Sequence, residues 1–384
     1  MYNRQAKEGL FLCANKRDIM AKKKRRRKLN AKGIALLTLL LVAVMTLGVA
    51  VGMAIYKKVN PEPKEPEQQI EEKQEETQVW GDETLGIDPK VDEELQDYRN
   101  ILLLGIDNGG RSDVLMLLSI NKKTNQVKSA TVLRDTYMQI DPDGTYEING
   151  EEREFYKCNR AYKKNGIYGA MMELNRHMDL NIRECITMDW DGMAKFIESM
   201  GGIEGDVESD AMMGFINVGT SPFADPDAPY KVDHTGQQHL NGYQAVQYLR
   251  ARKYDGGSPQ KRDARNQDAL QQLFEKAKNL SMSELEEIYD NVANDAESNI
   301  SRTTMTELLA LISQSNLETM DGWPYEYTEM WQDDNSFYYF VPDTLTSNVS
   351  EFHKKMFGQD NYDPTETVKT LNEKIETARK EQLH

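Results

Sequence analysis

Cysteine and histidine are scarce in this chain of 384 residues, which has three cysteines and five histidines. None of the cysteines lies in the histidine-and-acid context that a nucleophilic thiol requires, so a cysteine enzyme is excluded. The histidines form no HExxH motif and no comparable spacing, so the sequence predicts no zinc site. Chemistry based on a thiolate or on zinc is therefore not expected.

Several common catalytic and nucleotide-binding motifs are also missing. The chain has no G-x-S-x-G elbow, no Walker loop and no Rossmann glycine pattern. Basic residues are outnumbered, because 47 Lys and Arg stand against 63 Asp and Glu and give a net charge of −16. Nucleic-acid binding depends on neutralising phosphates with basic side chains, so this balance argues against a nucleic-acid partner.

One long uncharged apolar run is present, and it covers residues 34–55. Its 22 residues are enough to cross a hydrocarbon core of about 30 Å and are too many for an ordinary signal-peptide core. The preceding residues 1–33 contain 12 Lys and Arg against 2 Asp and Glu. The positive-inside rule then predicts a basic cytoplasmic tail and a single transmembrane helix that acts as a signal-anchor in the cell membrane. Everything after it is expected outside the cytoplasm.

The segments on either side of the main domain are polar. Because the whole chain carries −16 and residues 1–33 carry +10, residues 34–384 carry −26. Residues 56–97 are rich in Pro, Glu and Gln, a composition that cannot bury enough surface to offset its ordering entropy. We therefore expect an extended extracellular linker, with a short helix within 93–99. Residues 359–384 are predicted to form a polar, helical and frayed tail.

The remaining residues, 98–358, predict one large domain. Strand-like apolar runs alternate with segments of helical periodicity. Strands are expected at 100–106, 114–120, 127–133, 184–190, 203–207 and 336–341, and helices at 167–178, 190–200, 241–248, 261–280 and 301–313. This alternation is typical of an α/β layered domain.

Two of the cysteines, Cys158 and Cys185, lie in this predicted exterior domain. A disulfide between them could persist there, because the compartment is oxidising. Two buried free thiols are the other interpretation, since free cysteine is among the most buried residue types. The sequence leaves both open.

Arginines and aspartates gather at the ends of the predicted strands. Asp107, Arg111 and Asp113 lie between the first two apolar runs, and Arg134 and Asp135 follow the third. Further arginines lie much later in the chain, at positions Arg250, Arg252, Arg262 and Arg265. Guanidinium groups bind phosphate in a bidentate manner, and carboxylates hold hard divalent cations. The set predicts a pocket for a diphosphate and its metal, and a purely structural ion-pair network is the alternative.

Seven short blocks of sequence occur in an order that resembles a known family. They are Gly105–Asp107, Arg111–Asp113, Leu133–Tyr137, Asn159–Tyr162, Gly201–Ile203, Leu240–Arg252 and Lys261–Gln267. Their order and the single amino-terminal span resemble the LytR-CpsA-Psr (LCP) family over residues 98–280 in detail, with an extension toward 358. The resemblance implies a mixed central sheet flanked by helices, with an apolar cavity for a polyprenyl chain.

The resemblance also implies an activity at the outer face of the cytoplasmic membrane, mostly in Gram-positive bacteria. Family members are implied to move a glycopolymer, such as a teichoic acid or a capsule polymer, from a polyprenyl-pyrophosphate carrier to a peptidoglycan hydroxyl. A phosphodiester link forms and polyprenyl phosphate is released. Two alternatives stay open: a polyprenyl-phosphate-binding membrane regulator without activity, and a pyrophosphatase in which water replaces the glycan hydroxyl.

Individual roles follow from the matching positions. Asp107 and Asp113 match the family's magnesium-binding aspartates, which predicts Mg²⁺ as the cofactor. The positions around the pyrophosphate are Arg111, Arg134, Arg250, Arg252, Arg262, Arg265 and Asn266. The predicted catalytic residues are Arg134, Asp113 and Asp135. Asp135 is the candidate base, with Asp107 or Asp113 as alternatives. Because Arg250 and Arg252 are two residues apart, they are expected on extended backbone, where they would face the same side.

Three features depart from the family pattern. The loop between Asp107 and Arg111 contains only Asn108, Gly109 and Gly110, whereas many members have a longer insertion. Asn266 stands where a glutamine is usual, and Leu133 stands where a proline is usual. We therefore expect the glycan-facing side of the site to differ from that of other members.

Overall fold

The computed structural model describes most of the chain from residue 79 onward. The described part is 79–381 without 143, 145, 149, 221–230, 252–258, 282–283, 285–286, 289–295, 302–314 and 333–336. The predicted tail 1–33 and transmembrane helix 34–55 lie outside it, as do Arg252 and nearly all of the predicted helix 301–313. Within the described part, no helix combines the length and apolar character needed to span a membrane.

A mixed six-stranded sheet forms the centre of the domain, with strand order β11-β8-β1-β2-β3-β12. Its strands are β1 (Tyr98–Ile106), β2 (Ser112–Asn121), β3 (Val127–Val132), β8 (Glu184–Asp189), β11 (Ala296–Ser298) and β12 (Leu317–Trp323). β1, β2 and β3 pair antiparallel in sequence, whereas β8 joins β1, and β12 joins β3, in parallel. The predicted mixed sheet is confirmed.

Among the described residues, four two-stranded sheets lie around this centre. They are β4 (Tyr137–Gln139) with β7 (Phe155–Lys157), β5 (Tyr146–Ile148) with β6 (Glu151–Arg153), β9 (Ile203–Val207) with β10 (Gly236–Leu240), and β13 (Tyr327–Gln332) with β14 (Phe337–Pro342). A single parallel bridge joins Thr136 to Phe340. It brings the β13–β14 hairpin beside the end of β3, next to Arg134 and Asp135.

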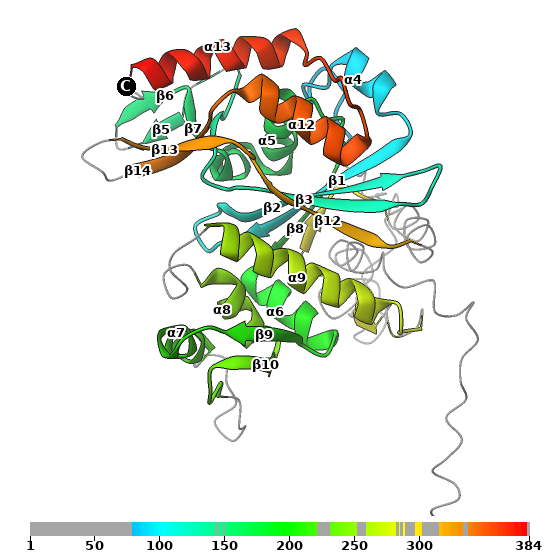
Figure 1. Cartoon of the computed structure of the whole chain (residues 1–384), viewed down its shortest axis with the longest axis vertical. Coiled ribbons are helices and arrows are strands. Elements are labelled where there is room, and N and C mark those ends of the chain that lie inside the picture. Colours follow the sequence, from blue (N-terminus) through cyan, green and yellow to red (C-terminus); the bar gives the residue numbers. More distant parts are fainter. Residues whose placement is uncertain are drawn as a thin grey trace, which may run out of the picture. The chain divides into compact units, whose positions relative to one another are not determined.

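Helices cover both faces of the central sheet (Figure 1). One layer contains α4 (Pro89–Glu94), α5 (Ala161–Met178, after the short η1, Cys158–Arg160), α12 (Leu345–Phe357) and α13 (Glu366–Lys380). The other contains α6 (Trp190–Ser199), α7 (Asp210–Thr220), α8 (Gly242–Arg250) and α9 (Pro259–Ala277). The predicted helices in 167–178, 190–200, 241–248 and 261–280 are therefore confirmed as α5, α6, α8 and α9.

The sheet separates two apolar cores. Successive side chains of a strand point to opposite faces, so Ile101 and Leu103 of β1 pack toward α6, α8 and α9. Leu102 packs toward the other layer, as does Leu104, which also reaches the cavity described below. Because both faces are covered, β1 reads as a continuous apolar run without alternation. This is why its sequence predicted a buried strand so clearly.

Helices α6 and α8, which pack on the Ile101 and Leu103 side of the sheet, approach each other closely. Gly242 begins α8 behind an Asn241 capping box, and a Cβ atom there would lie 1.9 Å from the carbonyl oxygen of Ala194. Only a residue without a side chain fits between these two backbones. The contact fixes α8, whose last residue is Arg250, against α6, whose first residue is Trp190.

The packed domain begins before residue 98, so the predicted linker 56–97 is too long at this end. Leu85, Val91 and Leu95 are at most 1 % exposed and belong to the core beside α5. The short helix is α4, where Asp88 caps the amino end by accepting from Lys90 N at 2.8 Å, and the expected helix at 93–99 is wrong. The polar composition of this segment gave no sign of packing, because its few buried apolar residues contact segments that are distant in the sequence.

The carboxy-terminal segment forms the predicted helix, α13, but it is packed, so the expectation that it is frayed was wrong. Val368, Leu371 and Ile375 of α13 are buried at 2 % exposure or less. Thr365 caps the helix and donates its hydroxyl to Asp179 Oδ1 at 2.6 Å. The tail therefore completes one layer of the domain, because its narrow apolar stripe meets α5 and α12.

Both cysteines of the domain are free and buried. Cys158 begins η1 and Cys185 lies in β8. The structure therefore shows the second of the two interpretations that the sequence left open. Burial raises the pKa of each thiol well above its usual value, so neither forms a reactive thiolate near neutral pH.

Candidate functional site

The candidate site lies where β1 ends and β2 begins. The loop between these strands holds Asp107 and Arg111, and Asp113 is the second residue of β2. Gly110 has φ of 72°, a left-handed conformation that glycine adopts without steric cost. The short loop is thus a tight turn that presents its carboxylates at one end of the central sheet.

Asp107 is held by its own loop. Its Oδ1 accepts hydrogen bonds from the backbone amides of Gly109 and Arg111, both at 2.9 Å. Its Oδ2 accepts one from Arg111 Nε at 2.7 Å. Burial would raise the pKa of Asp107, but these hydrogen bonds hold it below its usual value. The Arg111 side chain is 42 % exposed, so this pair closes the turn at the surface.

A series of ion pairs runs from Asp113 through Arg134 to Asp135. The Arg134 guanidinium pairs with Asp113 Oδ1, and both side chains are 14 % exposed. Arg134 Nε lies 3.5 Å from Asp135 Oδ2. The structural network considered as an alternative is therefore present. It lies beside the candidate pocket, because Asp113 also lines the cavity described below.

Asp135 is enclosed and 2 % exposed. Lys157 Nζ lies 2.9 Å from its Oδ1, and the Tyr338 hydroxyl donates to its Oδ2 at 3.0 Å. Its backbone carbonyl accepts from Phe340 N at 3.0 Å. A general base must reach the proton that it removes, and these partners surround the carboxylate. The geometry therefore favours a positioning role for Asp135, acting on Arg134, over the predicted role as base.

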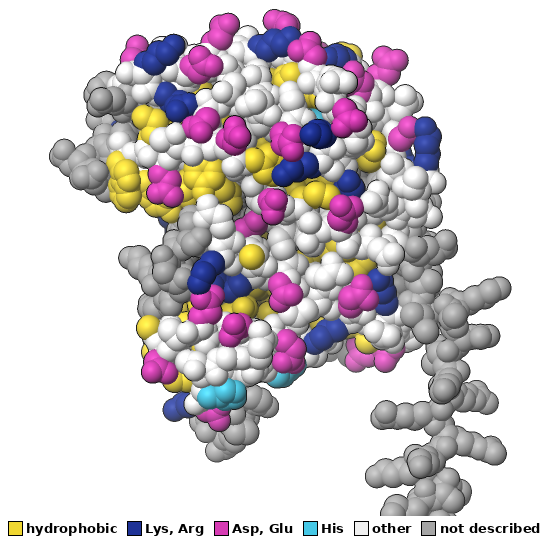
Figure 2. Space-filling view, in the orientation of Figure 1, with side chains coloured by type: hydrophobic (Ala, Val, Ile, Leu, Met, Phe, Trp, Pro, Cys, Tyr) yellow, Lys and Arg dark blue, Asp and Glu magenta, His cyan; other side chains and the backbone are white. Residues whose placement is uncertain are grey.

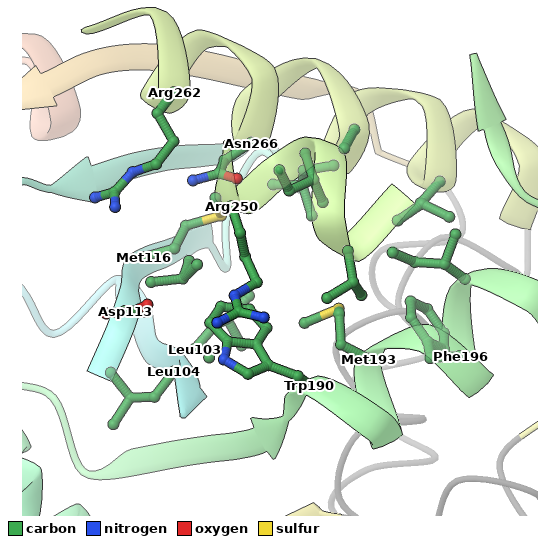
Figure 3. A pocket seen from close by; sticks show the side chains of 18 residues that line it. Leu103, Leu104, Asp113, Met116, Trp190, Met193, Phe196, Arg250, Arg262 and Asn266 are labelled. Atoms are coloured by element: carbon green, nitrogen blue, oxygen red, sulfur yellow. The ribbon is translucent and has the colours of Figure 1, made fainter. Parts of the chain in front are cut away.

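An apolar cavity lies between the central sheet and the layer of α6, α8 and α9 (Figure 3). It holds about 810 Å³ of empty space, including the open solvent at its mouth. Its apolar lining is Leu103, Leu104, Val114, Met116, Trp190, Met193, Phe196, Ile197, Val246, Leu249, Ala269, Leu270 and Leu273. Its polar lining is Asp113, Arg250, Arg262 and Asn266. A predominantly apolar wall with a small number of polar groups is typical of ligand pockets.

Arg250 lies at the polar side of this cavity. Its guanidinium is 4.9 Å from the ring centroid of Trp190, and Figure 3 shows the two side chains against each other. Burial lowers the pKa of Arg250, and the charge of Asp107 acts in the opposite direction. Within the described residues no carboxylate forms an ion pair with Arg250. A half-buried guanidinium of this kind is suited to an anionic ligand.

The expected extended backbone around Arg250 is found only after that residue. Arg250 is still helical, as the last residue of α8, and the chain turns at Ala251 with φ −59° and ψ 124°. The helix brings Arg250 to the cavity together with Val246, one turn earlier. The expectation was wrong for Arg250 because the helix that holds Val246 and Leu249 in the cavity wall continues through it.

α9 contributes two of the predicted residues to the cavity and turns a third away. Arg262 and Asn266 are four residues apart, on one face of the helix, and both line the cavity. Arg265 instead donates to the Ala251 carbonyl, and its guanidinium lies 5.4 Å from the Tyr248 ring centroid. Its contacts fasten the end of α8, so the geometry does not support a direct pyrophosphate contact from Arg265.

The carboxylates fit a magnesium ion only in part. Within the described residues, no group of three or more His, Cys, Asp or Glu side chains is arranged to hold a metal ion. Asp107 already accepts hydrogen bonds on both oxygens, so it would bind a metal only if Arg111 released it. Asp113 faces the cavity and pairs through one oxygen, which fits the common case of Mg²⁺ held by one or two carboxylates, substrate phosphates and water.

The sequence did not indicate three residues that shape this site. Trp190 supports Arg250, and Lys157 and Tyr338 enclose Asp135. Lys157 lies two residues before the block Asn159–Tyr162, and this nearness to the block is the one local signal in its favour. Trp190 and Tyr338 carry no local signal, because their roles depend on how distant segments pack together.

The described domain combines a mixed α/β sheet with an apolar cavity that has a half-buried arginine in its wall, and these features define the class of fold and site. The chain belongs to the LytR_cpsA_psr family, whose model matches residues 53–355. TagV of Bacillus subtilis (strain 168), named a polyisoprenyl-teichoic acid–peptidoglycan teichoic acid transferase, is 27% identical over 285 residues. The match covers 71% of this chain and 67% of that protein.

Solved structures show the same fold. The crystal structure of B. subtilis TagV matches with a TM-score of 0.51 and 25% identity, and the match covers 70% of this chain and 99% of TagV. TagT bound to LIIa-WTA matches with a TM-score of 0.54 and 22% identity, over 69% of this chain and 92% of TagT. The described domain therefore has the architecture of these proteins.

Proposed function

We propose that this chain transfers a glycopolymer from a polyprenyl-pyrophosphate carrier to a hydroxyl group of peptidoglycan. Membership of the LytR_cpsA_psr family and the names of relatives such as TagV support this activity. The observation that carries it in this chain is the pairing of an apolar cavity with Arg250, a half-buried cation without a carboxylate partner among the described residues. An isoprenoid chain fits the first, and a diphosphate fits the second.

The reaction follows from where the two parts of the carrier would lie. The isoprenoid occupies the cavity and the diphosphate lies at its mouth, against Arg250, Arg262 and Asn266. The acceptor hydroxyl attacks the phosphorus that bears the sugar. The bond from that phosphorus to the bridging oxygen breaks, polyprenyl phosphate leaves with the electron pair, and the hydroxyl proton is lost. The product is a phosphodiester between glycopolymer and peptidoglycan.

The protein's own residues act mainly by positioning and electrostatics, as is general for phosphoryl transfer. Arg134 is oriented between Asp113 and Asp135, and it stabilises negative charge that develops on the phosphoryl oxygens. Of the three candidate bases, Asp113 alone lines the cavity. We therefore assign the contact with the reacting phosphates, or with their metal, to Asp113.

Mg²⁺ is proposed as the cofactor, held by Asp113 together with the diphosphate. When bound, it would neutralise charge on the diphosphate and on the departing phosphate. Support comes from the chemistry of this hard oxygen donor at the cavity wall. We also propose the location that the sequence predicts: a single-pass protein of the cell membrane, with residues 1–33 cytoplasmic and the domain outside.

The test uses the full-length protein in detergent with a polyprenyl-pyrophosphate saccharide, Mg²⁺ and a peptidoglycan acceptor. We expect a phosphodiester-linked product. Asp113→Ala and Arg134→Ala should each lower kcat by roughly 100-fold or more, the usual effect of removing one preorganised electrostatic group. Asp97→Ala is the matched control. Asp97 lies just before β1, and its carboxylate pairs with the exposed Lys123. The turnover of this variant should stay normal.

The same assay separates the two alternatives. Release of a glycan phosphate without linkage to peptidoglycan would identify a pyrophosphatase. Tight binding of the carrier lipid without turnover under any condition would identify a binding protein. Normal turnover in both Asp113→Ala and Arg134→Ala would refute the site assignment.

A further inference from the structure

One face of the β13–β14 hairpin is aromatic. In the antiparallel register Trp331 lies opposite Tyr338, and Glu329 lies opposite Phe340, so the side chains of these four residues share a face with that of Tyr327. The rings contact one another: the centroids are 5.3 Å apart for Trp331 and Tyr338, and 4.8 Å apart for Tyr327 and Phe340. We name this the aromatic face, and Figure 2 shows hydrophobic side chains gathered over the hairpin.

The aromatic face is open to solvent at Trp331. This indole is 54 % exposed, and the only other large hydrophobic residues with comparable exposure in the described part are Val79 and Val218. Those two are aliphatic and lie elsewhere, whereas Trp331 belongs to a continuous row of rings. The row runs from the exposed Trp331 through the partly buried Tyr338 to the buried Phe340, and an exposed indole backed by further rings is suited to binding a ligand.

The aromatic face is continuous with the candidate site on two sides. The Tyr338 hydroxyl donates to Asp135, the neighbour of Arg134, and Phe340 N donates to the Asp135 carbonyl. At the other end, Gln260 at the start of α9 contacts the Tyr327 hydroxyl. Gln260 precedes the cavity residue Arg262 by two positions. The face therefore borders both the ion-pair series and the helix that supplies the cavity mouth.

We propose that the aromatic face binds the acceptor glycan strand, and this assignment rests on the proposed function. In phosphoryl transfer the attacking and leaving oxygens lie roughly in line. The leaving polyprenyl phosphate belongs to the cavity, so the acceptor hydroxyl approaches from the opposite side of the phosphorus. The series of contacts that begins at the cavity wall with Asp113 runs through Arg134 and Asp135 to Tyr338, and we place the approaching strand against Tyr338.

The chemistry of the aromatic face fits a saccharide. The face of an aromatic ring carries negative potential, and the C–H groups on one side of a sugar ring are weakly positive, so the two stack. Glu329 lies on the same face and is exposed, and its carboxylate can accept hydrogen bonds from sugar hydroxyls. Contact with an anionic lipid surface is disfavoured by the same carboxylate, together with that of the neighbouring Glu326, which is exposed.

The test measures acceptor binding without any donor. Fluorescently labelled glycan strands, released from peptidoglycan and freed of peptide, are titrated with the full-length protein in detergent and followed by anisotropy. Trp331→Ala should raise the Kd about 2- to 10-fold, the usual worth of one aromatic contact. Trp331→Tyr keeps a ring and should retain most of the affinity. Val218→Ala on α7 removes an exposed apolar side chain elsewhere and should leave the Kd unchanged.

A second measurement identifies the occupant. In the transfer assay, Trp331→Ala should raise the KM for the acceptor while the KM for the lipid-linked donor stays within twofold. A raised donor KM with an unchanged acceptor KM would place the donor glycan on this face and overturn the assignment. Reduced binding to anionic vesicles with no change for glycan strands would identify a membrane contact and overturn it as well.

The two proposals fail separately. If no transfer is found with any donor but Trp331→Ala still weakens glycan binding, the aromatic face is a saccharide site and the transfer activity is refuted. If transfer is found but glycan strands bind Trp331→Ala as they bind the unaltered protein, the function stands and the aromatic face is not the acceptor site.

Discussion

Arg250 offers a test in which ligand affinity should fall while the stability of the free protein does not. Its guanidinium is half-buried over Trp190, and within the described part of the chain no carboxylate pairs with it. Replacing Arg250 with Met keeps most of the stem that packs against the cavity wall and removes the charge. The free protein then no longer carries a partly desolvated cation, so its free energy of unfolding should not fall.

The effect on ligand binding should be large. A hydrogen bond to a charged group contributes about 1.5–3 kcal/mol, which corresponds to a loss of roughly 10- to 150-fold in affinity for polyprenyl pyrophosphate. Arg250→Lys keeps the charge but not the planar, bidentate geometry, so its affinity should lie between those of Arg250→Met and the unaltered protein. The measurements are the Kd of the full-length protein for the lipid and its urea unfolding curve.

Arg99 is the matched control for this experiment. It lies at the start of β1 and is partly buried, but unlike Arg250 it has a carboxylate partner, because Glu184 accepts its Nε hydrogen bond at 2.7 Å. Arg99→Met leaves that carboxylate without its partner, so stability should fall by about 1 kcal/mol while lipid affinity is retained. An Arg250→Met protein that loses stability and keeps its lipid affinity would refute the reasoning, because Arg250 would then be a structural residue like Arg99.

Two further predictions concern the layer opposite the cavity. Glu173 of α5 is fully buried with neither carboxyl oxygen hydrogen-bonded, and burial raises its pKa well above the usual value even though Arg176 opposes the shift. In the folded protein the neutral carboxyl is favoured, so its contribution to stability is fully present below the unfolded pKa near 4.5 and is lost as pH rises toward the folded pKa. Glu173→Leu should therefore be about 1–3 kcal/mol more stable than the unaltered protein at pH 8. The gain in stability should be smaller at pH 4.5. Equal gains in urea unfolding at both pH values would contradict this. Leu371→Ala in α13 should cost about 2–4 kcal/mol, against nearly nothing for the exposed neighbour Glu373→Ala, and equal urea midpoints for the two would mean that α13 is not part of the packed domain.

The sequence predicted the central strands well, because a strand that is buried on both faces is a continuous run of apolar residues, which can be recognised locally. The apolar runs at β1, β2 and β3 fit a buried strand better than any other secondary structure. The ends of the domain left no such record. Residues 80–97 and 359–381 are polar on average, and only the few positions such as Leu85 and Leu371 that meet distant partners show that they are packed.

The site was predictable in composition and less so in arrangement. Asp113, Arg250, Arg262 and Asn266 do meet at one cavity. Arg265 is of the same residue type as Arg262 and lies three residues further along the same block, yet its side chain turns toward Ala251. Sequence order cannot distinguish these two orientations, because they depend on the rotation of α9 against the sheet. Asp135 illustrates the same limit, since its enclosing partners Lys157 and Tyr338 come from separate segments.

The alternation of side chains along β1 has a consequence for how such a protein can diverge. Leu103 borders the cavity, whereas its neighbour Leu102 packs the solid layer on the far side of the sheet. Substitutions at Leu103 and at its partner in register, Met116, can lengthen, shorten or reshape the ligand space without disturbing the packing that Leu102 maintains. Different positions of one strand therefore determine ligand preference and the packing of the fold. Related proteins can change the carrier that they bind by substitution at the cavity positions while the fold is retained.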